Sequence, residues 1–110
     1  MFEIRKTFSI SAAHELALNY PSECSNLHGH NWKIQVICRS DALNEHGMVM
    51  DFKKIKNLIQ SELDHAYLNN HIPGNPTAEN IAYFIASRIG DMCAEVQVEE
   101  TEGNVAIWKK

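Results

Sequence analysis

The chain has 110 residues, of which 45% are hydrophobic and 22% are charged, with a formal net charge of -4 at pH 7. This size predicts one compact domain over residues 1–110 with a small core, so we expect a homo-oligomer. The acidic balance, without clustered Lys and Arg, argues against a nucleic-acid binder. We also expect no membrane association and a cytoplasmic protein, because the sequence has no run of about 18 apolar residues and no signal-peptide layout. The three cysteines are widely spaced, which predicts no disulfide framework.

The first segment predicts a β-strand with one buried face. One parity of residues 2–11 carries the apolar side chains Phe2, Ile4, Phe8 and Ile10. If the extended conformation continues, Ala12 and His14 fall on this same side. A single histidine at such a place is more often a core residue than a ligand, so His14 needs partners to be read as a metal ligand.

A second strand over residues 30–40 supplies those partners. The run from Cys24 to His30 holds a thiol and two imidazoles, and it ends a polar loop over residues 15–27. Because side chains alternate along a strand, His28 and His30 point to the same side and can converge on one ion. The three histidines together then match a catalytic zinc site that keeps a fourth position open.

Two alternatives to this metal site stay open. If Cys24 also bound the ion, the centre would be closed and structural. Imidazoles also accept iron and other first-row ions, so zinc is the expected metal rather than the only one that fits.

The middle of the chain predicts two helices. After a turn at residues 41–47 and a short extended piece at 48–50, a helical period runs from residue 51 to about 65, with Asp51 as N-cap. Its expected buried stripe is Phe52, Ile55, Leu58, Ile59 and Leu63. A second helix starts after the N-cap Thr77 and ends at Gly90, with Ile81, Phe84, Ile85 and Ile89 buried.

Two strands, over residues 94–101 and 105–108, complete the order ββααββ, which indicates an α+β fold. In the third strand Glu100 shares the parity of Val96 and Val98. A carboxylate that continues an apolar face requires a partner, and a ligand with paired N–H donors would serve.

Two further groups could move protons. A thiol beside a dication favours the thiolate, so Cys24 is a candidate base or nucleophile, whereas Cys38 and Cys93 are read as buried apolar residues. The Asp64–His65 pair is a second candidate, because a carboxylate commonly orients an imidazole. Neighbouring residues on a helix do not face each other, so this pair requires the helix to end there.

Several motifs together resemble the 6-pyruvoyl-tetrahydropterin synthase family, and within it the bacterial branch that makes 6-carboxy-5,6,7,8-tetrahydropterin for queuosine biosynthesis. They span nearly the whole chain in the family's order: Ser11-Ala12-Ala13-His14, the Cys24–His30 run, Gly47-Met48-Val49-Met50-Asp51-Phe52, Leu63-Asp64-His65-Ala66-Tyr67-Leu68-Asn69, Asn75-Pro76-Thr77-Ala78-Glu79-Asn80 and Glu100-Thr101.

The resemblance implies a tunnelling-type fold, in which an antiparallel sheet carries two helices on one face and several subunits close a β-barrel. A hexamer built as a dimer of trimers, or a tetramer, is implied, with active sites at subunit interfaces. The implied site residues are His14, His28 and His30 for Zn²⁺, Cys24, Asp64 and His65 for catalysis, and Glu100, Thr77 and Glu79 for the pterin.

The implied reaction is a zinc-dependent lyase step. 7,8-Dihydroneopterin triphosphate would give 6-carboxy-5,6,7,8-tetrahydropterin, acetaldehyde and triphosphate. The alternatives are the 6-pyruvoyl product, in which the side chain is retained, a non-catalytic metal or pterin-binding module, and a small metallohydrolase. Leu27 and Asn26 stand where the folate-type branch carries a glutamate, which disfavours that branch although Glu23 lies next to Cys24.

Overall fold

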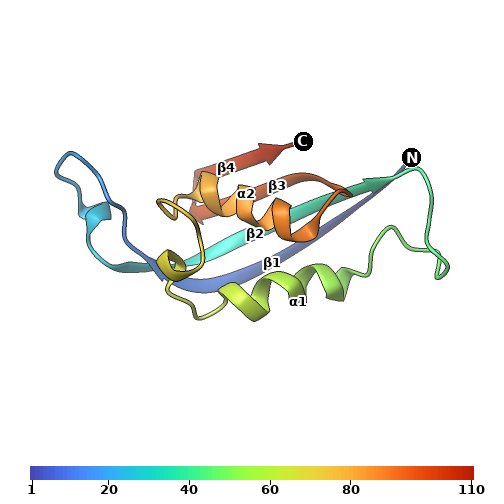
Figure 1. Cartoon of the computed structure of the whole chain (residues 1–110), viewed down its shortest axis with the longest axis horizontal. Helices are drawn as coiled ribbons and strands as arrows, with labels where there is room; N and C mark the ends of the chain where they lie inside the picture. The colour runs from blue at the N-terminus through green and yellow to red at the C-terminus, as the bar shows by residue number, and fades with distance from the viewer.

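A computed structural model describes all residues 1–110 (Figure 1). Its elements are β1 (Phe2–His14), the 3₁₀ turn η1 (Glu23–Ser25), β2 (His28–Ser40), α1 (Phe52–Leu63), the 3₁₀ turn η2 (Leu68–Asn70), α2 (Ala78–Ile89), β3 (Cys93–Thr101) and β4 (Asn104–Lys109). The order of strands and helices confirms the predicted α+β class. Neither α-helix is long and apolar enough to cross a membrane.

The four strands form one antiparallel sheet in the order β1-β2-β3-β4. Both helices cover the same face of this sheet, as Figure 1 shows. The sheet is open, with β1 and β4 at its edges, so a barrel would need strands from other subunits. Barrel closure therefore stays a prediction.

The core lies between the sheet and the helices because alternate strand residues face one way. Its strand members are Phe8, Ile10, Ala12, Trp32, Ile34, Val36, Val96 and Val98, and its helix members include Ile55, Ile59, Leu63, Ile81, Ile85 and Ile89. Cys38 and Cys93 are also buried, as predicted.

The predicted burial of α1 and α2 is partly wrong. Phe52 and Leu58 are exposed by 48% and 37%. The buried residues Ile55, Ile59 and Leu63 follow the four-residue spacing of a narrow stripe, and Phe52 and Leu58 lie outside it. On α2, Phe84 packs against the core but is only partly buried.

The predicted extended piece at residues 48–50 is also wrong. Asn44 closes a turn there, since its carbonyl accepts from Gly47 N at 2.9 Å and its side-chain Oδ1 accepts from Met48 N at 3.1 Å. Val49 is buried in the core. The apolar side chains of this segment therefore serve core packing, and the segment does not pair with a strand.

Glu62 of α1 links the two helices. Its carboxylate accepts hydrogen bonds from Arg88 Nε at 3.1 Å and Nη2 at 3.3 Å, and from His71 Nδ1 at 3.3 Å. Burial by itself raises the pKa of Glu62, but the hydrogen bonds from Arg88 and His71 outweigh burial and lower the pKa.

We predict that Glu62→Gln lowers the free energy of unfolding at neutral pH by about 1 kcal/mol or less, the range of partly exposed ion pairs. Because the folded carboxyl has the lower pKa, its contribution is present above the unfolded value of about 4.3 and is lost as the pH falls through the folded pKa. In urea titrations, the free energies of unfolding of the variant and wild type should therefore differ at neutral pH and become equal in acid. Glu102→Gln, at an exposed turn, is the control, and an equal difference at both pH values would contradict the prediction.

Candidate metal centre and active-site hollow

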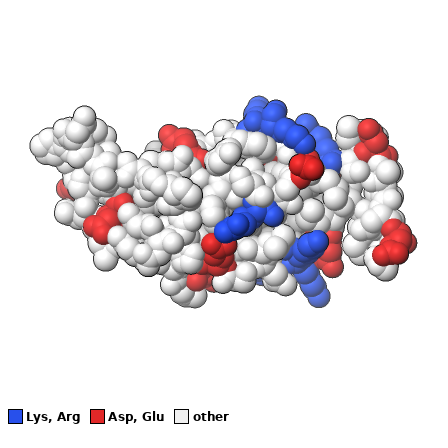
Figure 2. All heavy atoms as spheres, in the orientation of Figure 1, with Lys and Arg blue, Asp and Glu red and all other residues white.

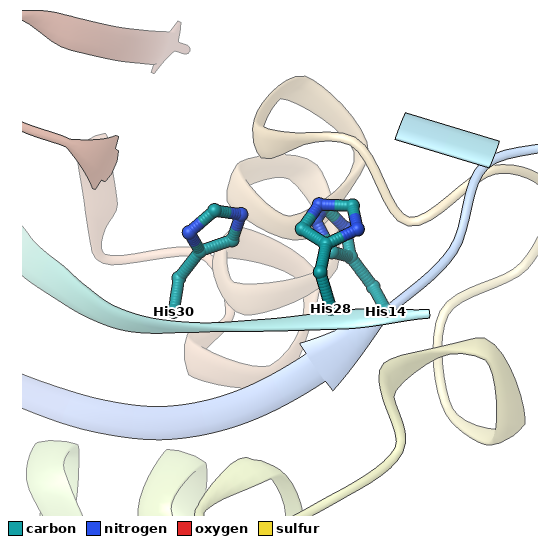
Figure 3. A group of neighbouring side chains, drawn as sticks. All are labelled: His14, His28 and His30. Carbon is teal, nitrogen blue, oxygen red and sulfur yellow. The ribbon is translucent and has the colours of Figure 1, made fainter. Parts of the chain in front are cut away.

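Three imidazoles converge at one end of the β1–β2 pair. In the register of these strands His14 lies opposite His28, and Ala12 lies opposite His30. All three side chains rise on the same side of the strands (Figure 3), and one ligand atom from each lies within 4.8 Å of the others. The parity predicted from the sequence is thus what brings the three histidines together.

The rings are oriented by backbone carbonyls. His14 Nδ1 donates to the Pro76 carbonyl at 2.7 Å, and His28 Nδ1 donates to the Asn26 carbonyl at 2.6 Å. Such bonds fix the tautomer and leave Nε2 unprotonated as a metal ligand. The Nε2 atoms of His14 and His30 are buried without a hydrogen-bond partner, a costly arrangement that a metal ion would relieve.

Burial lowers the pKa of the His14 imidazole below its ordinary value of 6.5, although the hydrogen bond to Pro76 opposes this effect. A neutral imidazole is the form that binds metal. Trp32 packs edge-on against His14 and His30, with ring centroids 4.8 and 5.2 Å away, and its Nε1 donates to the Ala12 carbonyl at 3.1 Å. The fully buried Trp32 therefore forms one wall of the cluster.

Glu100 lies on the face that its strand parity predicts. Its carboxylate oxygens are 3.8 Å from His14 Nε2 and 3.7 Å from His30 Nε2. No hydrogen bond joins the carboxylate to these two nitrogens, so the imidazoles by themselves do not supply the partner that a carboxylate at this position requires. Within this chain no Lys or Arg pairs with Glu100.

Cys24 is not a member of the histidine cluster. It is exposed in the turn η1, where its backbone N–H donates to Ser22 Oγ at 3.1 Å. Cys24, Glu100, Thr77 and Glu79 line one hollow of about 500 Å³. Thr77 also caps α2, as predicted, by accepting from Asn80 N at 3.2 Å.

Asp64 and His65 lie apart from this hollow. The helix α1 ends at Leu63, which allows the predicted contact between Asp64 Oδ2 and His65 Nε2 at 3.7 Å. Asp64 Oδ1 accepts from Ser11 N at 2.9 Å, and His65, with a left-handed φ of 58°, exposes 83% of its side chain. His65 lines a second hollow with residues 11–13 of β1 and residues 29–31 of β2, which include His30.

Sequence reasoning missed the groups that orient the site. Nothing in the pattern marked the carbonyls of Asn26 and Pro76 as acceptors, because every residue has a carbonyl. The role of Trp32 had a weak signal in its parity with His28 and His30. That parity placed its large ring on the histidine side of β2.

The chain is similar in sequence and fold to known proteins. The family model for 6-pyruvoyl tetrahydropterin synthase matches residues 3–110. A 6-carboxy-5,6,7,8-tetrahydropterin synthase of Synechocystis is 40% identical over 98 residues, covering 81% of this chain and 75% of that protein. A dihydroneopterin monophosphate aldolase of Pyrococcus furiosus is 40% identical over 84 residues, covering 74% of this chain and 68% of that protein.

A solved structure of 6-pyruvoyl tetrahydropterin synthase from Caenorhabditis elegans has the same fold, with a TM-score of 0.78 and 26% identity, and the match covers 99% of this chain and 95% of that one. Together with the family match over residues 3–110, this shows that the chain belongs to the 6-pyruvoyl tetrahydropterin synthase family.

Proposed function

We propose that this protein is a zinc-dependent lyase that converts 7,8-dihydroneopterin triphosphate to 6-carboxy-5,6,7,8-tetrahydropterin, with release of acetaldehyde and triphosphate. The observation that carries the proposal is the cluster of His14, His28 and His30, with the Glu100 carboxylate 3.7–3.8 Å from two of its rings and lining one hollow with the Cys24 thiol. The similarity to the 6-carboxy synthase of Synechocystis supports this branch. We propose queuosine biosynthesis as the pathway and the cytoplasm as the compartment.

Each group of site residues has a separate proposed role: metal binding, proton transfer or pterin binding. A zinc ion held by the three histidines would act as a Lewis acid towards the side-chain oxygens of the substrate. Cys24 removes a proton from the adjacent carbon, and His65, oriented by Asp64, returns or shuttles a proton. Glu100 accepts two N–H bonds from the 2-amino-pyrimidinone edge of the pterin, while Thr77 and Glu79 line the pocket.

The placement of His65 supports an active site shared between subunits. The segment that carries His65 and Ala66 is hydrogen-bonded to β1 at one edge of the sheet, through His65 N to Ser11 O and Ala13 N to Ala66 O. The hollow of Cys24 is lined by residues 104–107 at β4, the other edge. Pairing of β4 with β1 of another subunit is a head-to-tail contact that closes a ring. Such a ring, a hexamer or a tetramer, would bring the partner's His65 towards Cys24.

A second candidate is an aldolase that acts on dihydroneopterin monophosphate, as the name of the Pyrococcus furiosus relative states for that protein. It is favoured by the charge of the site. No Lys or Arg lines either hollow, and none occurs between residues 7 and 32. Figure 2 shows Lys and Arg over the middle and right of one face and none at the left end, where Figure 1 places the loop of residues 15–27. A triphosphate bound in either hollow would therefore meet no Lys or Arg among the lining residues of this chain.

The metal assignment predicts that His28→Ala loses zinc. Removing one of three ligands should weaken affinity by more than the roughly 10–100-fold that follows loss of an outer-shell partner. Zinc content after dialysis against a graded chelator, measured by mass spectrometry, tests this. His46→Ala is the matched control, because His46 is exposed in the distant turn. Full zinc retention by His28→Ala would refute the ligand set.

The reaction is tested by the products of the zinc-containing protein. With 7,8-dihydroneopterin triphosphate we expect 6-carboxy-5,6,7,8-tetrahydropterin and acetaldehyde by mass analysis. The 6-pyruvoyl product would select the other branch of the family instead. Side-chain cleavage of dihydroneopterin monophosphate with its phosphate retained would select the aldolase, and no conversion of either compound would leave a non-catalytic binding module.

The role of Cys24 predicts that Cys24→Ala lowers kcat by about 10²–10⁴-fold, the range for a positioned acid or base. Zinc content and pterin binding should stay unchanged, because Cys24 lies outside the histidine cluster. Ser25→Ala, the next residue of the same turn, controls for disturbance of the loop. Turnover at the wild-type rate in Cys24→Ala would rule out the proposed base.

A further inference from the structure

The position of Glu100, next to the histidine cluster, is not explained by pterin anchoring alone. Its carboxylate lies 3.7–3.8 Å from the Nε2 atoms of His30 and His14, and its side chain is 25% exposed. The strand register shifts between Glu99 and Thr101, and this irregularity stands at Glu100. Glu100 thus reaches into the histidine cluster from a strand that contributes no histidine.

This position is too close for the anchoring role alone. If the metal holds oxygens of the substrate side chain and Glu100 holds the far N–H edge of the pterin, the bicyclic ring lies between them. A separation of 3.7–3.8 Å is a single van der Waals contact, which leaves no room for a ring system. Glu100 must therefore move away from the histidines when a pterin binds.

The observed position of Glu100 near His14 and His30 suits a metal ligand. Carboxylate oxygens bind zinc at about 2.0–2.2 Å and imidazole nitrogens at about 2.0–2.1 Å, so neighbouring ligand atoms of a tetrahedral ion lie about 3.3 Å apart. The observed distances from Glu100 to His14 and His30 exceed this by only a few tenths of an ångström. Both Nε2 atoms are buried without a hydrogen-bond partner, so they and the carboxylate face one shared position.

We infer that Glu100 is the fourth metal ligand in the substrate-free protein and leaves the metal when a pterin offers its paired N–H donors. The inference rests on the proposed function and adds a second state of the same residue. This exchange couples pterin binding to catalysis, because the metal has an open coordination position only when the pterin ring is bound. A phosphate or polyol without an N–H edge does not draw Glu100 away.

Cobalt(II) is the probe, since its visible absorption reports the number and type of its ligands. We compare wild type with Glu100→Gln, which keeps the shape of the side chain, and with Glu100→Ala. The control is Glu99→Gln, because Glu99 lies on the other parity of β3 and lines a separate hollow with Lys33. Circular dichroism checks that each variant is folded.

Without pterin, we expect Glu100→Gln and Glu100→Ala to change the cobalt spectrum and to weaken cobalt binding by roughly 10-fold or more. Glu99→Gln should match wild type. Unsubstituted pterin, which has the N–H edge but no side-chain hydroxyls, should shift the wild-type spectrum towards that of Glu100→Ala and leave the spectrum of Glu100→Ala unchanged.

The outcomes separate the two proposals. Identical spectra and affinities in wild type and both Glu100 variants would overturn the inference, even if the variants lose pterin binding and so support the anchoring role. Failure of pterin to bind wild type would instead contradict the proposed function, while the spectra alone would still decide whether Glu100 is a ligand.

Discussion

The register of β1 against β2 is the constraint on which the site depends. It pairs His14 with His28 and Ala12 with His30, so three imidazoles on two strands share one side of the sheet. A slip of one residue would send the side chains of one strand to the opposite face. The same register is set by Ile10 opposite Trp32 and Phe8 opposite Ile34, which are core pairs. Packing of the core therefore specifies the geometry of the candidate metal centre.

Burial and hydrogen bonding act on the cluster in the same direction. Burial keeps His14 neutral, and the carbonyls of Pro76 and Asn26 hold Nδ1 so that Nε2 faces the other rings. Pro76 directly precedes Thr77, the N-cap of α2, so the start of this helix is tied to the His14 ring of the candidate metal centre. A change that displaces α2 would alter the orientation of His14 as well as the hollow.

Strand parity predicted the features that depend on alternation alone. It put His14, His28 and His30 on one side and Glu100 on the apolar face, and capping residues predicted where both helices begin. It could not predict the carbonyls that orient the rings or the exposure of Phe52 and Leu58, because these follow from three-dimensional packing. The apolar segment at residues 48–50 was read as extended, although Asn44 closes a turn there.

Metal binding and proton transfer differ in what they require of the fold. The three histidines lie within one hairpin, so a single folded chain can assemble them. Asp64 and His65 are fixed to the outer edge of β1, and Cys24 and Glu100 open towards β4, at the opposite edge of an open sheet. Within one chain these two edges are not paired with each other, because β1 and β4 lie at opposite ends of the strand order. In the proposed assembly, closure of the ring between subunits is therefore the step that turns a metal-binding chain into a catalyst.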